Sequence, residues 1–159
     1  MNKTSKTVFL VRGALIGALY VVLTLVASSV GLANGMIQVR FSEALCALPI
    51  IFPEAGFGVT IGCLLSNIIT GCPMPDIVFG TLATFLGAVL SFRLRKNRIL
   101  ALFMPVLSNS IIIPFVLKYA YGLADMWYIL ALSIFVGEFI SCVILGMAVL
   151  RIGDRIKKL

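Results

Sequence analysis

The chain has 159 residues, of which 61% are hydrophobic and 12% are charged, and its mean hydropathy is +1.14. Soluble domains contain about 45–50% apolar and about 25% charged residues, so this composition excludes an ordinary soluble protein. The sequence contains no histidine, which excludes histidine triads, histidine general bases and histidine metal ligands. We therefore expect one integral-membrane domain over residues 1–159, with no catalytic residues, no metal and no cofactor.

The net charge of +7 comes from 13 basic and 6 acidic residues. In a soluble protein such an excess would suggest a nucleic-acid partner. Here the basic residues cluster between long apolar runs, as charges beside membrane helices do, so we expect a lipid bilayer and no nucleic acid. The four cysteines show no C-x-x-C spacing and are expected to act as small hydrophobic side chains, with Cys72 alone accessible.

Six apolar segments follow one another along the chain without internal repeats. We expect six transmembrane helices over approximately residues 8–31, 37–52, 55–70, 77–92, 100–121 and 126–150. A helix needs about 20 apolar residues to cross the hydrocarbon core, so segments two to four are expected to be shallow, broken or packed inside the bundle. A cleaved signal peptide is the alternative for the first segment, but its apolar stretch is long and no A-x-A site ends it.

The basic residues predict the orientation. Six crossings place 11 of the 13 on one side: Lys3, Lys6 and Arg12, then Arg93, Arg95, Lys96 and Arg98, then Arg151, Arg155, Lys157 and Lys158. Arg40 and Lys118 belong to the other side. By the positive-inside rule both termini are cytoplasmic.

Polar side chains within the apolar segments or at their ends are the candidate substrate-binding residues, because such groups are costly in a bilayer and usually functional. They are Arg40, Glu43, Asn67, Asp76, Asn109, Lys118 and Glu138. All of them fall at the midplane or in the outer half of their segments. The sequence therefore predicts a polar pocket that is loaded from outside.

Most of these residues also have a structural explanation. Lys118 could extend to the outer interface, Arg40 and Glu43 could pair at i,i+3 spacing, and Asp76 could cap the fourth helix. The two asparagines could form hydrogen bonds between helices. Glu138 is the hardest to explain in this way, because a lone carboxylate at the midplane needs a partner or a proton.

The first segment carries Ala14 and Ala18 one turn apart, with Gly13 and Gly17 beside them at the same spacing. Small residues four apart let helices approach closely, either inside one bundle or between subunits. The chain has no G-x-x-x-x-G-K-[ST] loop, so it is not expected to hydrolyse ATP or to be an enzyme.

Three stretches, RFSEAL at 40–45, GCLLSN at 62–67 and DIVFGTLAT at 76–84, resemble the QueT family, and Asn109 and the Gly137-Glu138 pair fit the same pattern. The resemblance implies a six-helix, all-α S-component of an energy-coupling factor transporter in the cell membrane. It implies uptake of a queuosine precursor, a 7-deazaguanine base in the aminomethyl or cyano form. It also implies that Ala14 and Ala18 dock on a membrane T-component attached to two cytoplasmic ATPases.

A deazaguanine offers two adjacent donors that one carboxylate can accept, and an aminomethyl group would add a cation for a second carboxylate. Glu43 and Glu138 could fill these roles. Residues 31–39 would form a lid, and aromatic side chains at the outer end would stack on the base or line the interface: Tyr121, Trp127 and Tyr128. The alternatives are an S-component for another vitamin, a self-sufficient proton-coupled carrier that uses Glu138, and a membrane-embedded enzyme or assembly factor.

Overall fold

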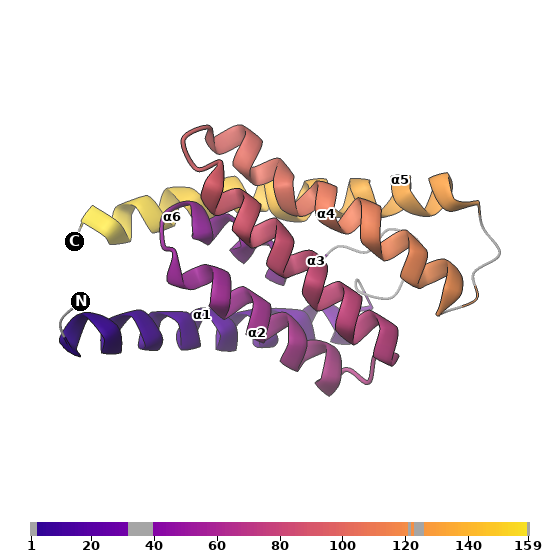
Figure 1. The fold of residues 1–159 in the computed structure, drawn as a ribbon, viewed down its shortest axis with the longest axis horizontal. Coiled ribbons are helices and arrows are strands. Elements are labelled where there is room, and N and C mark those ends of the chain that lie inside the picture. Colours follow the sequence, from indigo (N-terminus) through magenta and orange to yellow (C-terminus); the bar gives the residue numbers. More distant parts are fainter. Residues whose placement is uncertain (1–2, 32–39, 121, 123–125, 159) are drawn as a thin grey trace.

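The computed structural model describes residues 3–31, 40–120, 122 and 126–158, and all regular secondary structure in them is helical. The elements are α1 (Lys3–Ser29), the 3-10 helix η1 (Phe41–Ile50), α2 (Glu54–Ile69), α3 (Met74–Arg93), α4 (Arg98–Tyr119), α5 (Trp127–Glu138), the π-helix η2 (Phe139–Leu145) and α6 (Gly146–Lys158). They run back and forth along one long axis, and α1 begins at the end of the bundle where α6 finishes (Figure 1).

Four helical stretches are long and apolar enough to cross a membrane, namely Lys6–Ser29, Met74–Arg93, Arg98–Tyr119 and Trp127–Lys157. Two shorter apolar helices, Phe41–Ile50 and Glu54–Ile69, complete the bundle. The prediction of an all-helical membrane protein with six apolar segments is thus confirmed at this level. The fourth segment, expected to be short and at the lower limit for spanning, is longer than predicted, because α3 has 20 residues and is one of the candidate spans.

The second segment differs from the expected helix over residues 37–52. Its described part is a ten-residue 3-10 helix with Pro49 inside, and residues 37–39 lie outside the described residues. A 3-10 helix rises about 2.0 Å per residue against 1.5 Å for an α-helix, so η1 extends about 20 Å with only ten residues. It packs against α1, α2, α3, α4, η2 and α6, so it is the central element of the bundle.

Glycines bring α1 and α2 into close contact. A Cβ atom on Gly58 would lie 2.5 Å from the carbonyl oxygen of Gly13, and one on Gly62 would lie 2.8 Å from that of Gly17. Ala14 and Ala18 are exposed on another face of α1. Internal packing therefore accounts for the glycines of the first segment, whereas the two alanines remain on the surface of the bundle.

The last segment continues beyond the predicted residue 150, to Lys158. A single π-helical stretch starts immediately after Glu138 and separates α5 from α6. π-Bulges of this kind are rare and are found mostly at functional sites.

An ion pair joins α4 to α6. Arg98 at the start of α4 forms a bidentate ion pair with Asp154 of α6, with N–O distances of 2.6 and 3.0 Å.

Candidate ligand-binding site

A small cavity lies between η1, α3, α4 and α5. Its lining residues are Arg40, Glu43, Gly80, Thr84, Asn109, Ile113, Ile134 and Glu138. The cavity volume is about 10 Å³, which is close to the minimum that holds one water molecule. Four of the seven side chains predicted from the sequence meet here: Arg40 and Glu43 from one segment, Asn109 from α4 and Glu138 from α5.

Glu43 is buried on η1, and its carboxyl group accepts one hydrogen bond from α1 and one from η1 itself. The hydroxyl of the buried Tyr20 donates a hydrogen bond to Oε1 of Glu43, and the Cys46 thiol donates to Oε2 at 3.1 Å. One turn further along α1, Thr24 donates to the hydroxyl of Ser42 at 2.8 Å. Hydrogen bonds to a charged group contribute about 1.5–3 kcal/mol each, so α1 stabilises a carboxylate that would otherwise be costly inside the bundle.

Glu138 ends α5 and is 8% exposed. The thiol of Cys142 donates to its Oε2 at 3.2 Å, and the Asn109 side chain interacts with the same carboxyl group. The Cys142 sulfur also lies 3.5 Å from the backbone carbonyl oxygen of Glu43. The Glu138 carboxyl group therefore has protein partners, and Cys142 connects it to the segment that carries Glu43.

Asn67 and Asp76 are buried beside the cavity rather than in its lining. A Cβ atom on the lining residue Gly80 would lie 3.3 Å from Nδ2 of Asn67 and 3.4 Å from Oδ1 of Asp76. Both buried side chains therefore lie close to the α3 backbone at Gly80. The alternative that Asp76 caps the fourth helix is wrong. The helix begins at Met74 with Pro73 in the N-cap position, and Asp76 lies in its first turn.

Arg40 precedes η1 and lies outside the four candidate spans. Burial lowers the pKa of Arg40, but the negative charges around it, first that of Asp76, raise this pKa by more, to above the ordinary arginine value. The guanidinium is thus a permanent cation near the carboxyl groups of Asp76 and Glu43, and the site combines both signs of charge.

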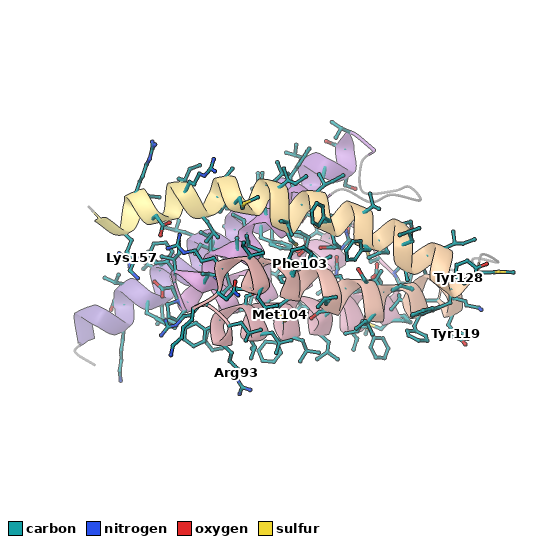
Figure 2. The ribbon with its side chains drawn as sticks, turned by 90° about the horizontal axis from the view of Figure 1, so that it is seen from above. Arg93, Phe103, Met104, Tyr119, Tyr128 and Lys157 are labelled. Atoms are coloured by element: carbon teal, nitrogen blue, oxygen red, sulfur yellow. The ribbon has the colours of Figure 1, made fainter. Side chains whose placement is uncertain are left out.

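Lys118 is the predicted site residue that the structure keeps away from the cavity. It is exposed in the last turn of α4, two residues before the C-cap residue Ala120. Tyr119, its neighbour, lies with Tyr128 at the end of the bundle away from Arg93 and Lys157 (Figure 2).

The described aromatic residues that were proposed for the outer end also lie away from the cavity. Trp127 packs on Phe115, with ring centroids 5.7 Å apart, and Tyr128 is exposed. Neither lines the cavity. Tyr121 and most of the predicted lid over 31–39 lie outside the described residues.

Sequence reasoning missed three side chains that hold the carboxylates: Tyr20, Cys46 and Cys142. The cysteines are buried, as expected for small hydrophobic residues, but their thiols also donate hydrogen bonds. Helical spacing could have shown this, because one cysteine follows Glu43 by three positions and the other follows Glu138 by four. No local signal connects Tyr20 to Glu43, which is 23 residues away.

The donor atoms would also suit a metal ion. A carboxylate oxygen of Glu43, one of Glu138 and the sulfur of Cys142 lie within 4.8 Å of one another. Because the cationic Arg40 lines the same cavity, we assign no metal to it. The arrangement is better suited to a polar organic molecule with several hydrogen-bond donors and acceptors.

Known proteins share sequence similarity with much of this chain. The queuosine precursor transporter QueT of Lactococcus lactis subsp. cremoris (strain MG1363) is 34% identical over 99 residues, which are 60% of this chain and 58% of that protein. No solved structure matches the chain. A model of the QueT transporter family matches residues 10–155, nearly the whole length. The chain is a multi-pass membrane protein that belongs to the QueT transporter family.

Proposed function

We propose that this chain is the substrate-binding S-component of an energy-coupling factor importer for a queuosine precursor, a 7-deazaguanine base. Membership of the QueT family and similarity to a queuosine precursor transporter support the substrate class. The observation that carries the proposal is the convergence of Glu43 and Glu138, with Arg40 and Asn109, on one buried cavity.

The chemistry of the cavity matches a deazaguanine. One carboxylate accepts the ring N–H and the exocyclic amine together, and the second carboxylate accepts from a further donor or cation on the ligand. Arg40 donates to the carbonyl oxygen, and Asn109 can either donate or accept at the remaining ring positions. These are directional contacts that distinguish a deazaguanine from an apolar molecule of the same size.

Binding requires the cavity to open. Ligand pockets usually have volumes of about 300–1,000 Å³, whereas this cavity has about 10 Å³. The donors that hold the two acids, Tyr20 and Cys46 on one side and Cys142 on the other, must therefore yield to ligand donors as the lining residues move apart. The closed form satisfies the buried carboxylates with protein groups, and ligand entry replaces those groups.

Calorimetric titration of the detergent-purified chain tests the proposal. The panel is a series of 7-deazaguanine precursors, with guanine, riboflavin and thiamine beside them. We expect tight binding of one deazaguanine, and a roughly 10- to 100-fold loss in Glu138→Gln, because a charge-assisted hydrogen bond is lost. The matched control is Glu54→Gln, which changes a buried glutamate that pairs with Arg12 instead.

Other results would redirect the proposal. Binding of a vitamin but no deazaguanine would keep an S-component and change its substrate. Equal affinities of Glu138→Gln and the control would remove Glu138 from the site. No binding at all by folded protein, together with uptake by the chain alone under a pH gradient, would favour the proton-coupled carrier.

The coupling part of the proposal concerns the surface of α1. Ala14 and Ala18 are exposed and small, so another helix can approach α1 closely at this point. We place a membrane T-component here, with two ATPases attached to it on the cytoplasmic side, where we also place both termini. Because the chain has no phosphate-binding loop, the energy for release comes from these partners.

A further inference from the structure

A second hollow lies outside the polar site, on the surface formed by α3 and α4. It is an open groove of about 630 Å³ whose lining is almost entirely apolar. Phe79 and Leu82 of α3 and Ile111 and Phe115 of α4 line it and are 43–57% exposed. Side chains of this size at the surface of two membrane-crossing helices face the hydrocarbon core of the bilayer.

The groove reaches over only part of the membrane. Its lining runs along α4 from Ile111 to Ala120, with Tyr119 near its end, and along α3 from Pro75 to Leu82. At 1.5 Å per residue the α4 part is about 14 Å long, which is close to half of the roughly 30 Å hydrocarbon core. The acyl chain of one lipid is confined to one leaflet, so its length matches that of the groove.

A single positive charge stands at the outer end of this groove. Lys118 is exposed, and it follows Phe115 by three positions and Ile111 by seven, so it lies on the same stripe of α4 as these lining residues. Tyr119, beside it, lines the groove itself. An apolar channel that ends at an exposed ammonium group is complementary to an acyl chain that ends at a phosphate.

We propose that this groove binds one anionic phospholipid, with an acyl chain along α3 and α4 and its phosphate at Lys118. The proposal gives Lys118 a role that the polar cavity does not. It is independent of the proposed transport substrate, since the two sites share no lining residue.

Native mass spectrometry of the full chain in detergent tests the site. The chain is titrated with phosphatidylglycerol and with phosphatidylcholine of the same chain length. Ile111→Trp fills the groove from an exposed position, and Ile68→Trp is its control on α2, with a similarly exposed side chain. Lys118→Gln removes the charge, and Lys96→Gln is its control at the other end of α4.

We expect one phosphatidylglycerol to remain bound to the unmodified chain and to both controls, and to be lost from Ile111→Trp. Lys118→Gln should bind phosphatidylglycerol about fivefold more weakly and lose its preference over phosphatidylcholine, because one basic residue near a lipid phosphate contributes about that factor. Equal lipid occupancy in Ile111→Trp and Ile68→Trp would overturn the site. So would a dimer or a protein partner that shields the groove, or an unchanged lipid preference in Lys118→Gln.

Discussion

Replacing Gly62 with alanine is expected to push α1 away from α2 and to weaken ligand binding at the same time. The new Cβ atom would lie 2.7 Å from Cβ of Tyr20 and 2.8 Å from the carbonyl oxygen of Gly17. Ordinary van der Waals contact begins near 3.4 Å, so α1 must move by about 0.7 Å, which is 3.4 minus 2.7. Neither obstacle is the flexible end of a side chain, and overpacking of this kind costs about 1–3 kcal/mol.

The same displacement reaches the polar site through Tyr20. An O–H···O hydrogen bond has a usual length of about 2.7–2.8 Å, and a further 0.7 Å takes it to about 3.5 Å, which is too long. Glu43 then loses a donor from α1. For a chain of this size, a loss of about 1–3 kcal/mol lowers the unfolding temperature by roughly 2–12 °C.

Gly56→Ala is the matched control on the same helix. Its new Cβ atom would lie 3.9 Å from Cβ of Ala88, which is ordinary contact. Both substitutions gain the same helix propensity, about 0.5–1 kcal/mol, so the difference between them isolates the collision. The measurements are thermal unfolding in one detergent and calorimetric titration with a 7-deazaguanine. If Gly62→Ala unfolds at the temperature of Gly56→Ala or higher and binds equally well, the α1–α2 contact does not support the site.

Three further variants test other contacts. Tyr20→Phe keeps the buried ring but leaves one oxygen of Glu43 without its donor. Thermal unfolding should therefore show a loss of about 1–3 kcal/mol in the free energy of unfolding. An unchanged unfolding temperature would contradict a stabilising role of this hydrogen bond. Ala14→Leu should abolish co-purification with the T-component and ATPases while the calorimetric affinity for ligand stays the same; normal co-purification would exclude this face as the docking surface. Arg98→Ala removes the exposed ion pair with Asp154. The free energy of unfolding should fall by at most about 1 kcal/mol at low salt, and this difference should vanish near 1 M salt. A loss that persists at high salt would come from packing instead of charge.

Hydropathy, charge and residue type are enough to predict the class of protein and four of the residues that line the polar cavity. Hydropathy predicted a membrane bundle with six apolar segments, because a bilayer admits only long apolar helices as spans. Depth within those segments selected the polar residues, and Arg40, Glu43, Asn109 and Glu138 do meet in one cavity. This works because a charge at the midplane must face the interior, whatever the details of packing.

Which groups hold those acids, and where each helix face points, depends on how the helices pack together. Tyr20 and Glu43 are 23 residues apart, and Cys142 lies 99 residues from the carbonyl group of Glu43 that it contacts. The rotation of each helix separates the glycines of α1, which pack on α2, from Ala14 and Ala18 on its surface. It also leaves Lys118 exposed and away from the cavity. Hydropathy gives the depth of a residue in the membrane, but its direction around the helix axis depends on close packing between several helices at once.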